Sequence, residues 1–353
     1  MNNSSDGVFD RALTNAQQVE ETFYLNFSAN GTIAQNLHES DDAVRQRVRA
    51  IMESSCSPTR FLFDFTTFGS ELDTQVAQDL SSGAIAAIDS TDMLPLTNVM
   101  NTAFYSTGVS LITSRNRGQP EVVLTSTNTR YTDPVKVTSD DLGELCDELD
   151  LAREAKSWST TFREYQERQA AINCIQKTVL IDGPVFTQNL ITQTQGRDLY
   201  RQMLATDKRF IGIIKELSGS WTLCKWTAMS LERGEGFVIC LLKDQYGKRF
   251  GNDRSITSWI NGLQQEYIRG VYRPAEKAFA FECNLEDLPY TISLLRQNAS
   301  PTLNHEIPLL LETVDWHLRG SNNSEAIKSS FISEIQRNDY RMGVDITEER
   351  GLR

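Results

Sequence analysis

The chain has 353 residues, of which 39% are hydrophobic, and its formal net charge at pH 7 is −12. This length and apolar fraction exclude a small domain held together only by disulfides or metal, and allow one large domain or two ordinary ones. The acidic balance counts against DNA binding unless the cations gather on one face, because phosphate neutralisation by Lys and Arg supplies most of the affinity for DNA.

The sequence also bears on location and on metal ligands. No apolar run approaches the ~20 residues needed to cross a bilayer, and the N-terminus MNNSSDGVFD lacks the basic and then apolar profile of a signal peptide. We therefore expect a soluble, cytoplasmic protein with no membrane partner. The six cysteines lie far apart with no Cys-x-x-Cys pair, and there are three histidines, which argues against a zinc site.

The predicted elements begin with a polar, helical region. Val44, Val48 and Ile51 recur at helical spacing within the first 60 residues. The pattern then becomes β-like. SGAIAAIDS predicts a buried strand ending at Asp89, and FYSTGVSLITS and PEVVLTSTNT predict the rest of an antiparallel meander. Residues 139–174 are charged and helix-forming.

A second apolar strand, KTVLIDGP, stops at Asp182, where Gly183 and Pro184 force a turn. Further strands are predicted in RFIGIIKEL, GFVICLLKD and EKAFAFECN, and helices in GRDLYRQML, LEDLPYTISLLRQN and IPLLLETVDWHLRG. Strands first and β/α alternation afterwards predict an α/β protein with a mixed sheet covered by helices.

The two strand-end aspartates, Asp89 and Asp182, are the residues that point to chemistry. Ligands bind beyond the carboxyl ends of strands in open α/β sheets, so both are expected to face one crevice. Carboxylates are the preferred ligands of Mg²⁺ and Mn²⁺, and a pair of such ions about 3.5–4 Å apart can cleave a phosphodiester. Ordinary turn and N-cap aspartates would give the same pattern, so spacing alone leaves both interpretations open.

Four short motifs, in this order along the chain, resemble the NurA family of DNA-end-processing nucleases: AAIDS at 86–90, VLIDGPVF at 179–186, FIGIIKE at 210–216 and IPLLLETVD at 307–315. The resemblance implies an RNase H-like mixed β-sheet flanked by helices, with helical N- and C-terminal extensions. The implied regions are a helical dimer- or partner-contacting region at 1–75, a nuclease domain at 76–322 and a helical tail at 323–353.

The resemblance also implies the residues that hold the metal. Asp89 and Asp182 match the family's two strand aspartates, and the family places a glutamate on the helix before the second strand. TFREYQERQAAINCIQ offers Glu164 and Glu167, one turn apart on the same helix face. Glu167 is preferred because small residues follow it as in the family pattern.

Two further residues are matched toward the C-terminus. Lys215 corresponds to a family lysine suited to contact a scissile phosphate or to stabilise developing charge. Asp315 falls where family members carry His or Asp, and it is taken as a fourth carboxylate ligand. His317 becomes the candidate if the register differs, since residues two apart on a helix face different ways. Ser90 is a departure, because many relatives carry glycine there.

The function implied is a Mn²⁺- or Mg²⁺-dependent deoxyribonuclease with Asp89, Glu167, Asp182, Lys215 and Asp315 as its catalytic set. A homodimer would degrade DNA ends 5′ to 3′, with endonuclease activity left open. A HerA-type hexameric ATPase translocase would feed the DNA, since the chain lacks a P-loop. DNA repair and anti-phage defence both fit.

Two alternatives stay open. The Ser90 departure and the displaced histidine motivate a catalytically decayed DNA-clamp or translocase-interaction subunit. An enzyme acting on RNA or on a DNA junction is the other, because fold does not fix substrate.

Overall fold

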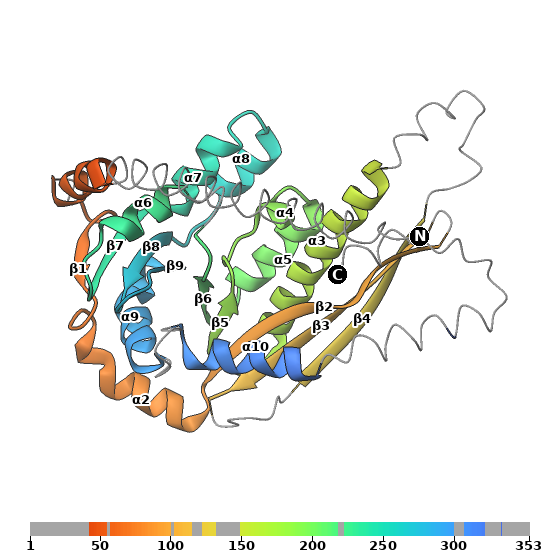
Figure 1. Ribbon diagram of the computed structural model, residues 1–353, viewed down its shortest axis with the longest axis horizontal. Coiled ribbons are helices and arrows are strands. Elements are labelled where there is room, and N and C mark those ends of the chain that lie inside the picture. Colours follow the sequence, from red (N-terminus) through yellow and green to blue (C-terminus); the bar gives the residue numbers. More distant parts are fainter. Residues whose placement is uncertain are drawn as a thin grey trace, which may run out of the picture. The chain divides into compact units, whose positions relative to one another are not determined.

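A computed structural model describes residues 42–54, 57–99, 102–114, 122–131, 149–217, 222–299, 307–321 and 333 (Figure 1). The chain divides into two compact units, Met1–Ser55 and Cys56–Arg353. The described part of the first unit is a helix over residues 42–54, as its spacing of apolar residues predicts. The predicted tail at 323–353 lies outside the described residues apart from residue 333. All elements named below belong to the second unit.

A nine-stranded mixed sheet forms the frame of this unit, in the order β1-β7-β8-β9-β6-β5-β2-β3-β4. Its strands are β1 (Leu62–Asp64), β2 (Ile85–Val99), β3 (Thr102–Thr113), β4 (Val122–Tyr131), β5 (Thr178–Asp182), β6 (Arg209–Ile214), β7 (Glu235–Leu241), β8 (Tyr267–Arg273) and β9 (Phe279–Asn284). β5 pairs in parallel with β2 and with β6, and the other pairs are antiparallel. The predicted meander is β2, β3 and β4.

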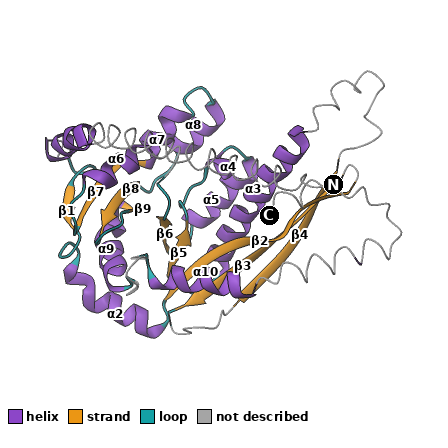
Figure 2. Ribbon diagram, in the orientation of Figure 1, coloured by secondary structure: helices purple, strands orange, loops and turns teal. Residues whose placement is uncertain are grey.

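Helices flank the sheet (Figure 2). Their bounds are η1 (Ser70–Leu72), α2 (Asp73–Ser82), α3 (Leu149–Asn173), α4 (Gln188–Ile191), α5 (Thr194–Leu204), α6 (Thr222–Ser230), α7 (Leu242–Arg249), α8 (Arg254–Asn261), η6 (Leu285–Asp287), α9 (Leu288–Gln297) and α10 (Leu309–Ser321). The predicted fold class, α/β with a mixed sheet flanked by helices, is confirmed.

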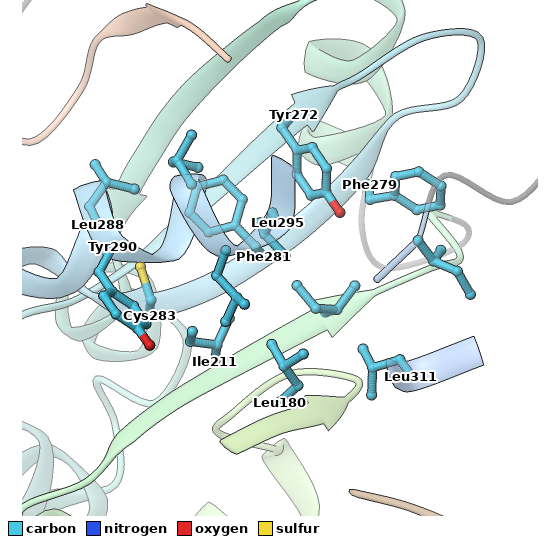
Figure 3. Packing of buried hydrophobic residues seen from close by; sticks show 14 of the residues in the cluster. Leu180, Ile211, Tyr272, Phe279, Phe281, Cys283, Leu288, Tyr290, Leu295 and Leu311 are labelled. Carbon is cyan, nitrogen blue, oxygen red and sulfur yellow. The ribbon is translucent and has the colours of Figure 1, made fainter. Parts of the chain in front are cut away.

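Alternate residues of the central strands point to two separate cores, because successive strand side chains face opposite sides. The first core takes Ala87 and Leu180 and includes residues of α2, α9 and α10 (Figure 3). The second core takes Ile88 and Val179 and includes residues of α3, α4, α5, α7 and α8. This alternation decides which helix each functional side chain meets.

Three sequence predictions differ from the structure. β2 does not end at Asp89 but continues to Val99, because it stays paired with β3 after its four-residue pairing with β5 has ended at Ile88. The segment GFVICLLKD is a strand only as far as Leu241, where α7 begins. The strands β1 and β8 are not predicted at all.

The N-terminal boundary of the sheet-bearing unit lies at Cys56 and not, as expected from the sequence, after residue 75. The reason is visible in the pairing, since Leu62 to Asp64 form β1 against β7. Among the described residues, no helix has both the length and the apolar character that a membrane crossing requires.

Lys208 closes the C-terminal end of α3. Its ammonium donates to the carbonyls of Ala171 (3.1 Å), Ile172 (2.8 Å) and Cys174, which satisfies acceptors that a helix end leaves open. We expect Lys208→Met to lower the free energy of unfolding by about 1–2 kcal/mol in urea titrations. Lys277→Met, at an exposed lysine before β9, is the control. Equal urea midpoints for the two variants would contradict this role.

Candidate active site

Asp89 and Asp182 lie at one edge of the sheet. Asp89 directly follows the residues of β2 that pair in parallel with β5, and Asp182 is the last residue of β5. By strand alternation both share the face of Ala87 and Leu180, which α10 covers. The prediction that these two aspartates meet at the carboxyl ends of neighbouring strands therefore agrees with the geometry.

Asp89 is a buried carboxylate in a negative environment. The residue is only 8% exposed to solvent. Burial, and then the charges of Asp182 and Glu167, raise its pKa to about 7, while Lys215 and the backbone N–H of Ser90, at 2.7 Å, oppose the rise. Asp89 therefore holds a proton for part of the time near neutral pH, and a cation bound beside it would release that proton.

Asp182 is paired with Lys215. The ammonium of Lys215 lies 2.7 Å from a carboxylate oxygen of Asp182, and both side chains are about one quarter exposed. Lys215 follows β6, the parallel neighbour of β5, so the two strand ends bring them together. Burial still raises the pKa of Asp182, with Lys215 opposing and Asp315 adding to the rise.

Glu167 reaches the same edge from α3, on the opposite face of the sheet. It accepts hydrogen bonds from the hydroxyl of Ser90 and from the guanidinium of Arg168. Burial raises its pKa, and Arg168 opposes the rise. Because Ser90 is the next residue after Asp89, it points to the α3 face and links Glu167 to the strand that carries Asp89.

Glu164, the alternative to Glu167, is engaged elsewhere. Its carboxylate accepts from the Thr187 hydroxyl at 2.6 Å and from the Asn189 amide at 3.3 Å. Both partners lie at the start of α4, and the charge of Glu164 is not among the causes that raise the pKa of Asp89. The geometry thus brings Glu167 to the candidate site and directs Glu164 to α4.

α10 contributes Asp315. The helix packs on β2, β3 and β5 through Leu311, Val314 and Leu318. Asp315 is close enough to Asp182 to raise its pKa. His317 lies two residues further along and therefore on another side of the helix, with Trp316 between them 70% exposed. The charge that acts on the aspartate of β5 is thus that of Asp315, the residue preferred from the sequence.

The donor set suits a hard divalent cation. Carboxylate oxygens are the ligands that Mg²⁺ and Mn²⁺ prefer, and the raised pKa of Asp89 reports buried negative charge that a cation would stabilise. Among the residues that the structure describes, no three His, Cys, Asp or Glu side chains stand close enough together to hold a metal ion. Lys215 and Arg168 instead neutralise Asp182 and Glu167, so a metal would compete with Lys215.

Three residues of this region carry no predicted role. Ser90 enters the sequence analysis only as a departure, yet it bonds Glu167. Arg168 gives no signal in a helix rich in charge. Glu282 does give a signal in the sequence, because it lies within the apolar strand FAFECN and a buried carboxylate has to be paired.

The chain thus has a mixed sheet with buried carboxylates at the carboxyl edge of its parallel strands. No protein-family model matches it, and no curated protein matches it. Similar solved structures include the NurA nuclease from Sulfolobus solfataricus, at 11% identity over 77% of this chain and 96% of that chain (TM-score 0.42). NurA bound to dAMP and manganese is similar at 9% identity over 70% and 90% of the two chains (TM-score 0.39).

A structure of NurA with manganese is similar at 9% identity, over 66% of this chain and 85% of that chain (TM-score 0.37). These proteins carry the name of the family whose motifs the sequence resembles. Similarity at this level concerns the fold and does not transfer an activity.

Proposed function

We propose that the chain is a metal-dependent deoxyribonuclease whose metal ligands are Asp89, Glu167, Asp182 and Asp315. One observation carries the proposal most: burial, and then the charges of Asp182 on β5 and Glu167 on α3, raise the pKa of Asp89 on β2 to about 7. Buried carboxylates that repel one another destabilise the folded protein unless a cation binds them. Carboxylates with perturbed pKa values cluster at functional sites.

The carboxylates have distinct parts in this proposal. Asp89 and Asp182 hold the cation from neighbouring strand ends, Asp315 holds it from α10, and Glu167 acts from α3 with Ser90 fixing its orientation. When bound, Mn²⁺ or Mg²⁺ supplies an activated water and neutralises charge on the scissile phosphate. Lys215, no longer needed to neutralise Asp182, is then free to stabilise negative charge that develops on that phosphate.

DNA as the substrate, 5′ to 3′ polarity, a homodimer and a HerA-type translocase partner are proposed from the motif resemblance. The proposed setting is cytoplasmic, in DNA repair or anti-phage defence. The regions 1–75 and 323–353 are proposed for dimer or translocase contacts. A deletion of the tail from residue 323 that leaves dimerisation and translocase binding unchanged would remove that part of the proposal.

The test of the activity uses wild-type protein and linear duplex DNA labelled at the 5′ or the 3′ end, with Mn²⁺, Mg²⁺ or EDTA, with and without a cognate translocase. We expect metal-dependent loss of label, first from the 5′ end. Closed circular DNA and RNA of the same sequence are the controls for exonuclease action and for the sugar. Absence of cleavage with either metal under both conditions would favour the decayed DNA-clamp or interaction subunit.

Lys215→Met should change metal binding and catalysis in opposite directions. Loss of the competing ammonium at 2.7 Å from Asp182 should tighten Mn²⁺ binding several-fold, while loss of charge stabilisation should lower the single-turnover rate by about 100-fold. Lys243→Met is the matched control, because Lys243 forms an ion pair with Glu266, which is not one of the proposed metal ligands. A Lys215→Met protein with wild-type rate and wild-type Mn²⁺ affinity would remove this role.

A further inference from the structure

The turn that follows Asp182 folds back over the neighbouring strand. Gly183 adopts a positive φ of 97° and donates its N–H to the carbonyl of Ile213 at 2.7 Å. The turn then crosses Gly212 so closely that a Cβ there would lie 2.6 Å from the carbonyl oxygen of Gly183 and 2.6 Å from the nitrogen of Val185. A side chain at position 212 would therefore displace the turn and, with it, the end of β5.

Glu282 binds this turn from the far side of Gly212. It pairs with Gly212 across the β6–β9 register and is fully buried. One carboxylate oxygen accepts the backbone N–H groups of Val185 (2.8 Å) and Phe186 (3.3 Å). The other oxygen accepts from the guanidinium of Arg269. Both oxygens of Glu282 are thus committed, one of them entirely to the backbone of the turn.

Arg168 binds the same turn from α3. Its side chain is 1% exposed, and it donates to the carbonyls of Pro184 and of Val185 (3.3 Å). The same guanidinium donates to Glu167. One planar group therefore joins the turn that carries Asp182 to the carboxylate that arrives from α3, and the forked geometry of arginine is what allows three acceptors to share it.

We propose that Arg168 and Glu282 are positioning residues, which clamp the turn from Gly183 to Phe186 and so set Asp182 and Glu167 at their places around Asp89. This inference rests on the proposed metal site and adds a supporting layer to it. A buried ion pair is weak support for stability, because its desolvation offsets its attraction. Here the buried charges of Arg168 and Glu282 form hydrogen bonds with backbone groups of one turn. Residues that orient metal ligands in this way strongly affect the affinity for the metal.

The test measures equilibrium Mn²⁺ binding without DNA, by electron paramagnetic resonance of the free ion, on full-length protein whose fold is checked by circular dichroism. Glu282→Gln keeps the shape of the side chain but replaces one of its two accepting oxygens by an amide NH₂ group, which cannot accept from the turn or from Arg269. Gly212→Ala pushes the turn without changing any charge. Arg168→Lys keeps the positive charge but loses the planar guanidinium that donates to Glu167, Pro184 and Val185. Lys208→Met is the matched control, since it weakens the other end of α3 and touches neither the turn nor the carboxylates.

We expect Glu282→Gln, Gly212→Ala and Arg168→Lys each to weaken Mn²⁺ binding by about 10- to 100-fold, with Lys208→Met within about two-fold of wild type although it melts earlier. Folded Glu282→Gln and Gly212→Ala proteins that bind Mn²⁺ like wild type would overturn the inference. So would wild-type binding by Arg168→Lys, because charge alone would then suffice.

If Glu282→Gln does not fold, the result for Gly212→Ala decides. If neither folds, the turn is a folding element and the positioning role is overturned. Wild-type protein that binds no Mn²⁺ would instead contradict the proposed metal site itself. Failure of the positioning role and failure of the metal site are therefore distinguishable.

Discussion

Asp182→Asn is expected to abolish metal-dependent DNA cleavage, with a loss on the order of 1000-fold in the single-turnover rate. Asp182 is the only residue of the candidate set that contacts Lys215 and also lies within the electrostatic reach of Asp89 and Asp315 in the described part of the chain. An amide there cannot neutralise a divalent cation. The rate is measured with end-labelled DNA at saturating Mn²⁺.

The same substitution should leave the fold intact. Asparagine keeps the shape and an acceptor for Lys215, and it removes one of the buried like charges that raise the pKa of Asp89, so we expect the free energy of unfolding to stay within about 1 kcal/mol of wild type. Asp198→Asn, at an exposed carboxylate on α5, is the control. Cleavage by Asp182→Asn at the rate of this control would exclude Asp182 from the site.

The metal-free protein should become less stable as the pH rises from about 5 to 7. The pKa of Asp89 is raised from its ordinary value of 3.8 to about 7 in the folded state. Between these values the folded protein therefore binds more protons than the unfolded chain, and the free energy of unfolding falls with rising pH, by a few kcal/mol at most. The raised pKa values of Glu167 and Asp182 act in the same direction.

Urea unfolding in EDTA at pH 5, 6, 7 and 8 measures this dependence, and Asp89→Asn should flatten it. Above pH 7 the Asp89 contribution should level off, because the carboxyl is then ionised in both states. Asp198→Asn again provides the control, since an exposed carboxylate should leave the slope unchanged. An identical pH slope for wild type and Asp89→Asn would show that Asp89 is not the titrating group.

Much of the site can be predicted because it depends on local pattern. An apolar run followed by aspartate puts Asp89 and Asp182 on strands, and parallel pairing of those strands puts both at one edge. The apolar residues of IPLLLETVDWHLRG predict the helix α10, whereas the choice of Asp315 on it comes from the resemblance. The local pattern thus predicts the elements, and the resemblance supplies the choice of residues on them.

What the sequence does not reveal depends on partners far away in the chain. β8 has two arginines and a glycine in YIRGVYR and shows no apolar run, yet Arg269 is buried because Glu282 of β9 neutralises it. β2 continues past Asp89 because β3 remains beside it, although its apolar run has ended. Arg168 and Glu282 meet at the turn after Asp182 from separate elements, and no spacing within either segment predicts that meeting.

The most direct measurement is equilibrium binding of Mn²⁺, without DNA, to wild-type protein and to the Asp89→Asn/Asp182→Asn double variant. The proposed site predicts saturable binding to wild type that the double variant loses while remaining folded, because the ligands from β2 and β5 are both gone. No binding by wild type, or equal binding by both proteins, would contradict a metal site at this edge of the sheet.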